Sequence, residues 1–343
     1  MAGRVLAPER AGQPSTLPTV GRSATGPHSE RVSITMITHN RRDTILSTIE
    51  RLLSLPERPA ITVVDNASTD GTVAAIRAAW PAIDVVALRR NVGAAARTVG
   101  VGRASTPYVA FSDDDSWWAP GALELAAGIL DAHPTLGVLA ARVLVGPEER
   151  EDPVCAMMAA SPLAASPLAA SPLAASPLAV GPLAASLPTA GSLGAGTASP
   201  GPSVLGFVAC GSIVRRDAYL AVGGFHPRFG VGGEEELLAA DLSAAGWELR
   251  YVDRVVAHHH PSPTRDPSRR RQIQARNALW FAWLRRRPRV AISRTLAALS
   301  AALHDSAMRS ALAEALRGLP WIVRERRAAP AALEASLARL ERQ

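Results

Sequence analysis

Three adjacent carboxylates follow a short apolar run and form the first group of residues that could do chemistry. Asp113, Asp114 and Asp115 follow the run 108–111 after one serine, Ser112. Neighbouring carboxylates repel one another unless a cation neutralises them, and oxygen ligands suit Mg2+ or Mn2+. Asp113 and Asp115 point to the same side of an extended chain, so both could contact one ion or one ligand. An acidic surface turn that caps the next helix is the alternative.

A second group could accept hydrogen bonds from a base or a ribose. Asp65 ends the apolar run 60–64, and Ser68 and Asp70 follow in a polar turn. For Ser68 and Asp70, the alternative is an Asx turn with a helix cap. An equivalent polar stretch begins at Thr38, the last residue of the run 31–38, and contains Asn40 and Arg41.

A third group could bind an anion. Asn91 and Gly93 precede a predicted helix that carries Arg97. Glycine beside a helix N-terminus lets the backbone approach an anionic ligand, and arginine neutralises phosphate. A plain helix start with solvated arginines is the alternative.

Acidic and histidine residues form the last groups. Glu234, Glu235 and Glu236 open a predicted helix, where acids are stabilised by the helix dipole or where one of them could act as a general base. The run 258–260 is three histidines at the end of a predicted strand. A neutral imidazole is a common ligand of divalent ions, and surface exposure is the alternative.

The elements that must position these groups alternate along the chain. Apart from the glutamates, each polar group lies at the end of a predicted strand, and helices separate the first four strands, which indicates a parallel α/β sheet with helices on both faces. Ligands of such sheets bind beyond the carboxyl ends of the strands. Strands are predicted over 31–38, 60–64, 83–88, 108–111, 136–145, 205–214, 248–252 and 255–256, and helices over 43–55, 72–80, 92–104, 121–132 and 234–245.

The chain divides into three predicted regions. Residues 1–30 read as a flexible leader without a secretory signal, 31–262 as the α/β domain, and 263–343 as a basic, amphipathic helical region. The stretch 153–203 contains Ser-Pro-Leu-Ala with a period of five, beginning at Ser161, Ser166, Ser171 and Ser176. We interpret it as an extended or disordered insert, because proline at this density prevents a regular helix.

Composition excludes several classes of protein. The 343 residues include no lysine, so a Walker A loop and a lysine Schiff base are excluded. The two cysteines cannot form a four-cysteine zinc site and are consistent with a reducing, cytoplasmic location.

In this order, the motifs resemble those of the family 2 glycosyltransferases with the GT-A fold. The resemblance runs from about Val32 to His260, outside the insert. It implies a Rossmann-like, mostly parallel sheet flanked by helices, with further helices at the C-terminus. It also implies inverting sugar transfer from a nucleotide diphosphate sugar with Mg2+ or Mn2+. The matching pieces are Ile37-Thr-His-Asn-Arg41, Val64-Asp-Asn-Ala-Ser-Thr-Asp-Gly71, Asn91-Val-Gly-Ala-Ala-Ala-Arg97, Phe111-Ser-Asp-Asp-Asp115 and Gly223-Gly-Phe225 followed by Gly233-Glu-Glu235.

The resemblance also implies roles for individual residues. Asp115 would bind the metal with Asp113 and a strand-end histidine, for which His258 is the first choice and His259 and His260 are the alternatives, and Glu235 would be the catalytic base. The family's Glu-Asp pair is Glu234-Glu235 here, so the base could instead be Glu234 or Glu236. The donor would contact Thr38, Asn40, Arg41, Asp65, Ser68, Asp70, Asn91, Gly93, Arg97, Asp113 and Asp114.

Other features of the resemblance narrow the subgroup. Thr98 replaces the asparagine that usually follows Arg97. The Gln-x-x-Arg-Trp motif of processive synthases is absent, which favours transfer of a single sugar. The histidine run with Pro-Ser-Pro, together with Arg276-Asn277, resembles soluble actinobacterial members, some of them rhamnosyltransferases.

Competing interpretations come from other classes. A sugar-phosphate nucleotidyltransferase would need glycines after the first strand, and a dinucleotide-binding enzyme would need Gly100-x-Gly102 directly after a strand. A relative that binds the nucleotide sugar without catalysis is a further alternative. The arginines of 265–289, interleaved with Trp280, Phe281 and Trp283, could bind nucleic acid or an anionic membrane. No nucleic-acid module is recognisable, so we favour a membrane-proximal glycan or lipid-linked acceptor at the inner face of the membrane. The sequence leaves the oligomeric state open.

Overall fold

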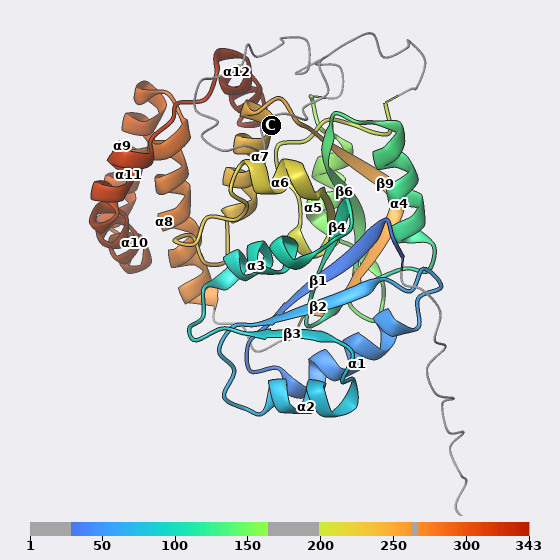
Figure 1. Cartoon of the computed structure of the whole chain (residues 1–343). Coiled ribbons are helices and arrows are strands. Elements are labelled where there is room, and N and C mark those ends of the chain that lie inside the picture. The colour runs from blue at the N-terminus through green and yellow to red at the C-terminus, as the bar shows by residue number, and fades with distance from the viewer. Residues whose placement is uncertain (1–28, 164–198, 262–266, 343) are drawn as a thin grey trace, which may run out of the picture.

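The structure is a computed structural model that describes residues 29–163, 199–261 and 267–342 (Figure 1). The predicted leader, apart from residues 29 and 30, lies outside the described residues, as do the repeats that begin at Ser166, Ser171 and Ser176. Within the described ranges, no helix has the length and apolar character that crossing a bilayer requires.

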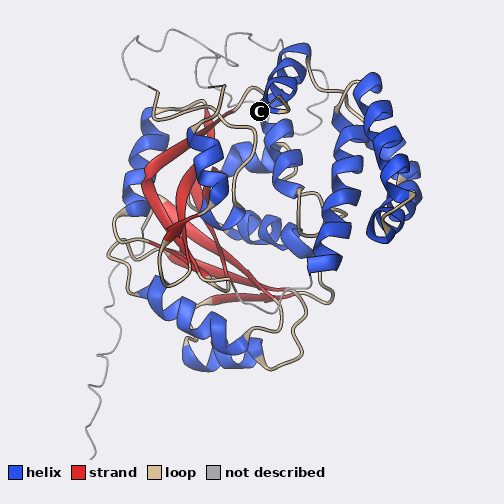
Figure 2. Cartoon of the chain, turned by 180° about the vertical axis from the view of Figure 1, so that it is seen from behind, coloured by secondary structure: helices blue, strands red, loops and turns tan. Residues whose placement is uncertain are grey.

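A nine-stranded sheet forms the centre of the molecule (Figure 2). Its order is β3-β2-β1-β4-β8-β6-β9-β5, with β7 paired to β6. β1, β2, β3 and β4 are mutually parallel, and β6 and β9 run in the same direction as these four because β8 lies antiparallel between β4 and β6. The predicted mostly parallel sheet is therefore confirmed. The strands are β1 Val32–Thr38, β2 Ala60–Asp65, β3 Asp84–Ala87, β4 Tyr108–Asp113, β5 Ser116–Trp118, β6 Leu136–Val145, β7 Arg150–Glu151, β8 Ser212–Arg215 and β9 Glu248–His259.

Helices cover both faces of this sheet and continue into a C-terminal layer (Figures 1 and 2). α1, α2 and α4 share one hydrophobic core with the strands, whereas α3, α5, α6 and α7 share the core of the opposite face. The helices are α1 Arg42–Leu53, α2 Thr72–Ala79, α3 Ala96–Arg103, α4 Ala122–Ala132, α5 Pro153–Ala159, α6 Arg216–Ala221, α7 Glu234–Ala244, α8 Pro267–Arg285, α9 Pro288–Ala302, α10 Ser306–Arg317, α11 Leu319–Glu325 and α12 Ala331–Leu340, with 3-10 turns η1 Gly93–Ala95 and η3 Ala209–Gly211.

Gly100 has a packing role in α3. A Cβ atom at this position would lie 2.3 Å from the Thr35 side chain of β1. Glycine is therefore needed at this position, where the helix crosses the sheet.

Two predicted segments differ from the structure. The predicted strand 205–214 is mostly irregular, and only its last residues contribute to β8 after the turn η3. Part of the predicted insert 153–203 is the helix α5, which starts at Pro153, where proline is tolerated because the first N–H of a helix needs no partner. Cys155 of this helix is buried against β6.

The aromatic residues of the basic segment lie in a core and not on the predicted binding surface. Trp280, Phe281 and Trp283 are buried in a third core that joins α7 to α8–α12. Arg285 forms an ion pair with Asp241 of α7, and Arg286 is buried beside Glu334. The segment is therefore a packed helix that attaches the C-terminal region to the domain.

Candidate active site

The polar groups lie at the carboxyl ends of three neighbouring parallel strands. Thr38 of β1 is in register with Asp65 of β2, and Ile37 is in register with Asp113 of β4. Since neighbouring strands are about 4.8 Å apart, Asp65 and Asp113 lie about 10 Å from each other across β1. This edge of the sheet therefore carries the residues that the sequence grouped together.

Asn40, Ser68 and Asp70 join the loops that follow β1 and β2. The Asn40 N–H donates to Ser68 Oγ (2.8 Å), and the Arg42 N–H donates to an oxygen of Asp70 (3.1 Å). Asp70 also accepts from the Thr72 N–H, which is the pattern of an Asx turn, whereas the N-cap residue of α2 is Gly71. A hollow of about 350 Å³ opens beside these loops; it is lined by Asn40, Arg41, Arg42, Asp43, Thr44 and Asp70.

Asp65 lies under these loops and retains hydrogen-bonding capacity. Its side chain is 1% exposed, and one oxygen accepts from the Ser68 N–H at 2.9 Å. The other oxygen is buried and has no hydrogen-bond partner among the described residues. An additional donor from a ligand would satisfy it.

Asn66 is a positioning residue that the sequence analysis missed. It is 3% exposed; its Oδ1 accepts from the Val92 N–H (3.1 Å), and its Nδ2 donates to the Gly93 carbonyl (3.2 Å). The backbone of Asn66 also accepts from His39. Asn66 thereby fixes the loop after β3 against the end of β2.

The predicted anion loop is used for packing instead. Gly93 has a left-handed backbone (φ 60°), and a Cβ atom there would lie 2.7 Å from the backbone of Gly230. The neighbouring Ala94 N–H donates to the Gly230 carbonyl (3.0 Å), and Asn91 accepts from the Gly93 N–H. The glycine therefore admits a second loop of the protein, where we had expected an anionic ligand.

Arg97 is directed into the protein. Its side chain is 4% exposed and forms an ion pair with Asp113, between the rings of Phe111 and Phe225. Burial alone would lower the pKa of Arg97, but the nearby carboxylates of Asp113 and Glu234 have the larger combined effect. The net pKa is raised, so the guanidinium stays charged. Arg97 thus orients Asp113.

Thr98, which stands where the family usually has asparagine, supports the same region. Its hydroxyl hydrogen-bonds that of Tyr219 (2.9 Å), which in turn accepts from the Phe225 N–H.

The three aspartates lie in different surroundings. Asp113 pairs with Arg97, Asp114 accepts from the Thr38 hydroxyl (3.0 Å), and Asp115 is buried. Burial and repulsion from its two neighbours raise the pKa of Asp114 to about 7. Bringing these carboxylates together therefore costs free energy that a bound cation would offset.

His259, and not the predicted His258, lies beside Asp115. The distance from His259 Nε2 to Asp115 Oδ1 is 3.3 Å, whereas His258 contacts Glu149 (2.8 Å) and stacks on Trp117. Although burial lowers the pKa of His259, hydrogen bonds to Asp115 and Cys210 raise it to about 10.

A mixed group of ligand atoms meets at this point. One atom each from Asp113, Cys210 and His259 lies within 4.8 Å of the others. A carboxylate, a thiol and an imidazole together can hold a divalent ion. Cys210 was missed from the sequence because nothing near it in the chain marks a ligand.

The three glutamates at the start of α7 have separate environments. Burial and repulsion from Glu235 raise the pKa of Glu234 to about 8, and its carboxylate accepts from the Gly232 N–H. Burial also raises the pKa of Glu235, which Arg97 partly offsets. Burial raises the pKa of Glu236 to about 7, with Arg286 as the nearest opposing charge. Glu234 and Glu235 therefore lie near Arg97, and Glu236 lies toward the C-terminal helices.

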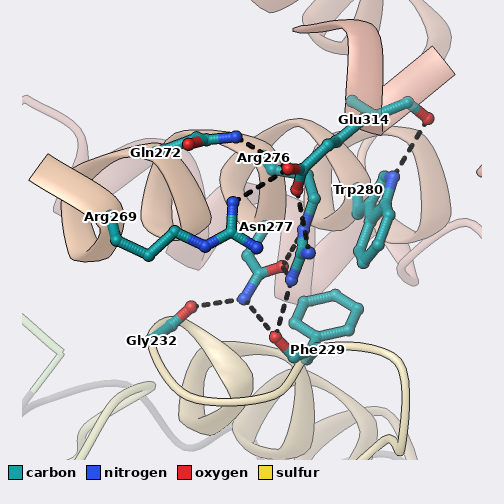
Figure 3. Close-up of polar contacts among 9 residues, drawn as sticks. Phe229, Gly232, Arg269, Gln272, Arg276, Asn277, Trp280 and Glu314 are labelled. Atoms are coloured by element: carbon teal, nitrogen blue, oxygen red, sulfur yellow. Dashed lines mark hydrogen bonds and ion pairs between the residues drawn. The ribbon is translucent and has the colours of Figure 1, made fainter. Parts of the chain in front are cut away.

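Helix α8 holds the loop that precedes these glutamates (Figure 3). Asn277 is 1% exposed, and its amide donates to the carbonyls of Phe229 (2.9 Å) and Gly232 (2.6 Å). Arg276 also donates to the Phe229 carbonyl, at 2.8 Å. The loop is thus held by α8 on one side and by Ala94 on the other.

Comparison with known proteins gives one family match. Residues 33–186 match the model described as glycosyl transferase family 2. No curated protein matches the chain.

Several solved structures are similar to the chain. The mannosyltransferase PcManGT from Pyrobaculum calidifontis, in complex with GDP-Man and Mn2+, is 18% identical with a TM-score of 0.49, covering 94% of this chain and 90% of that one. TarS of S. aureus is 15% identical with a TM-score of 0.46, covering 74% and 43%. TarS 1–349 in complex with UDP is 16% identical with a TM-score of 0.47, covering 74% and 72%.

Proposed function

The chain belongs to glycosyl transferase family 2 through residues 33–186, and on that premise we propose that it moves one sugar from a nucleotide diphosphate sugar to an acceptor hydroxyl, with inversion. It is a glycosyltransferase with the GT-A fold. The proposal rests mainly on one observation: the carboxylates of Asp65 and Asp113 lie at the same edge of the sheet, with Arg97 paired to Asp113 and two glutamates near Arg97.

The donor would bind along the ends of β1, β2 and β4. The buried oxygen of Asp65 that has no partner would accept a hydrogen bond from the nucleoside, next to the hollow that Asn40 and Arg41 line. Thr38 and Asp114 lie between this position and the remaining aspartates. Ser68, Asp70, Asn91, Gly93 and Arg97 would support the donor site by fixing its loops and its carboxylates.

A divalent cation would be held by Asp113, Asp115 and His259, with Cys210 close by. When bound, it would offset the negative charge that develops on the departing nucleotide diphosphate. Mg2+ and Mn2+ are the candidates for this function.

Glu235 is the proposed base. It would remove the proton from the acceptor hydroxyl as the oxygen attacks the anomeric carbon from the side opposite the leaving group. Burial raises the pKa of Glu235, and Arg97 and a hydrogen bond with Glu234, whose own pKa is raised to about 8, act in the opposite direction.

We also propose a glycan or lipid-linked acceptor at the inner face of an anionic membrane, with the protein in the cytoplasm and a role in the cell envelope. Two buried free thiols are consistent with a reducing compartment. One face of α9 carries exposed apolar side chains at helical spacing, Ile292, Leu296 and Leu299, and the exposed Leu303 follows at the C-cap. Arg287 and Arg289 are exposed at the start of the same helix, and helices that lie on anionic lipid commonly combine basic and apolar side chains.

The test of donor binding and transfer uses Asp115→Asn. A panel of nucleotide diphosphate sugars with Mn2+ should include one that raises the melting temperature of the wild type and supports release of the nucleotide diphosphate. Asp115→Asn should lose both effects, whereas Asp84→Asn, which removes a partly exposed ion pair with Arg103, should keep both. Full transfer by Asp115→Asn would overturn the proposed site.

The membrane contact has a separate test. Leu299→Glu should reduce co-sedimentation with vesicles that contain anionic lipid, and it should leave transfer to a soluble acceptor unchanged. Equal sedimentation of wild type and variant would contradict this assignment.

A further inference from the structure

The chain has two cysteines, and only one of them has an environment that packing explains. Cys155 is buried between α5 and β6, where it accepts from the Val143 N–H (3.2 Å) among apolar side chains. Cys210 is 3% exposed, and its sulfur lies near the carboxylate of Asp113 and the ring of His259. A buried thiol beside two other ligand groups is unusual for a residue that only fills space.

The fold brings these three groups together from distant segments. Asp113 ends β4, Cys210 lies in η3 directly before β8, and β8 is antiparallel to β4. His259 ends β9 and is in register with Ser116 of β5, only three residues after Asp113. The ligand atoms are therefore positioned by sheet pairing and not by one flexible loop.

The chemistry of this set differs from that of an all-oxygen site. Mg2+ binds oxygen ligands and dehydrates reluctantly, whereas Zn2+ and Co2+ bind thiolate and imidazole together with carboxylate. The ion pair with Arg97 uses Oδ1 of Asp113, so the carboxylate also has a second oxygen for an ion.

We propose that Cys210 is a direct thiolate ligand of the divalent ion at this site, together with Asp113 and His259, so that the protein binds Zn2+ or Co2+ more tightly than Mg2+. The inference deepens the proposed function and rests on it for the presence of a cation. On coordination, the Cys210 thiol and the protonated His259 each release a proton to solvent, and no electron is transferred.

Cobalt absorption tests the thiolate directly. The full chain, stripped of metal with a chelator, is titrated with Co2+ alone. We expect a thiolate-to-cobalt charge-transfer band in the near ultraviolet, in the wild type and equally in Cys155→Ser. Because the chain has two cysteines, a band that survives in Cys155→Ser must come from Cys210. A missing band in the wild type, or its loss in Cys155→Ser, would overturn the proposal.

Affinity provides a second measurement. Cys210→Ser should lose the band and weaken Co2+ binding by about tenfold or more, with little change in Mg2+ binding. If this variant does not fold, the band of Cys155→Ser still decides the question. An unchanged Co2+ affinity in folded Cys210→Ser would count against the thiolate ligand.

Failure of this inference and of the proposed function can be told apart. Mn2+-dependent sugar transfer without a charge-transfer band would leave the transferase standing and remove the thiolate. A band without transfer from any donor would keep the metal site and contradict the transferase.

Discussion

At the scale of single residues, Glu235 differs from its two neighbours in what it faces. Glu235 lies near Arg97 and Asp113, whereas Glu236 lies near Arg286. We expect Glu235→Gln to bind the donor normally and to lower kcat by about 10²- to 10⁴-fold, because the amide cannot take up a proton. Thermal shift measures donor binding, and release of the nucleotide diphosphate measures kcat. Glu236→Gln is the matched control and should keep most of its activity; equal loss in both variants would point to a structural effect.

Buried acids with raised pKa values predict how the stability of the metal-free protein depends on pH. The pKa is about 8 for Glu234 and about 7 for both Asp114 and Glu236. An acid with a raised native pKa binds its proton more tightly in the folded state, so its stabilisation is complete below the unfolded value and is lost as pH rises. His259, with a pKa of about 10, has the same sign at higher pH. The free energy of unfolding should therefore fall between about pH 5 and about pH 8.

Urea unfolding across this pH range checks the prediction. Glu234→Gln should flatten the pH dependence, because the amide does not titrate. A free energy of unfolding that rises toward pH 8 in the metal-free wild type would show that these acids are ionised without penalty.

At the scale of elements, α8 supports the site from outside the sheet. Asn277 satisfies two backbone carbonyls of the loop before Glu234 (Figure 3). We expect Asn277→Ala to lose about 1–3 kcal/mol of stability, because the Gly232 carbonyl loses its side-chain donor, whereas the Phe229 carbonyl keeps the one from Arg276. Since the loop positions the base and not the nucleoside, kcat should fall more than donor affinity. Urea unfolding and steady-state kinetics measure the two effects.

Gln272→Ala is the matched control for this variant. Its amide donates to Glu314 from the same helix and does not touch the loop. If both variants behave alike, the loop contacts of Asn277 are not responsible.

The sequence predicts most elements of the first half of the fold, because each strand and helix there is defined by its own local pattern. Asp65 and Asp113 follow directly from that pattern, since a residue at the end of a parallel strand lies at the binding edge. The predicted strand 205–214 failed because an apolar run has no local mark that separates a strand from an irregular buried segment.

Contacts between distant segments explain the remaining differences. Ala141 pairs with Val252 but Arg142 pairs with Val256, so β9 has three extra residues and its side chains change faces. This irregularity decides that His259 faces Asp115, and a single sequence does not show it. The approach of Gly93 to Gly230 depends in the same way on two loops 137 positions apart.

At the scale of the whole molecule, the C-terminal helices and the sheet domain form one packed body. α7 contacts both α8 and α12, and the third core contains side chains from α7 through α12. Arg286 is 3% exposed and donates to Glu334 of α12 (3.1 Å) and to Glu341 at the end of that helix (3.2 Å).

We expect Arg286→Ala to destabilise the whole protein by about 3 kcal/mol, because it leaves the buried Glu334 without its cation. Calorimetry should show a single transition at lower temperature, with donor binding lost in the same transition, whereas Arg289→Ala, an exposed arginine three positions away, should change little. Two separate transitions would contradict this expectation, because they would show that the C-terminal helices unfold independently of the sheet domain.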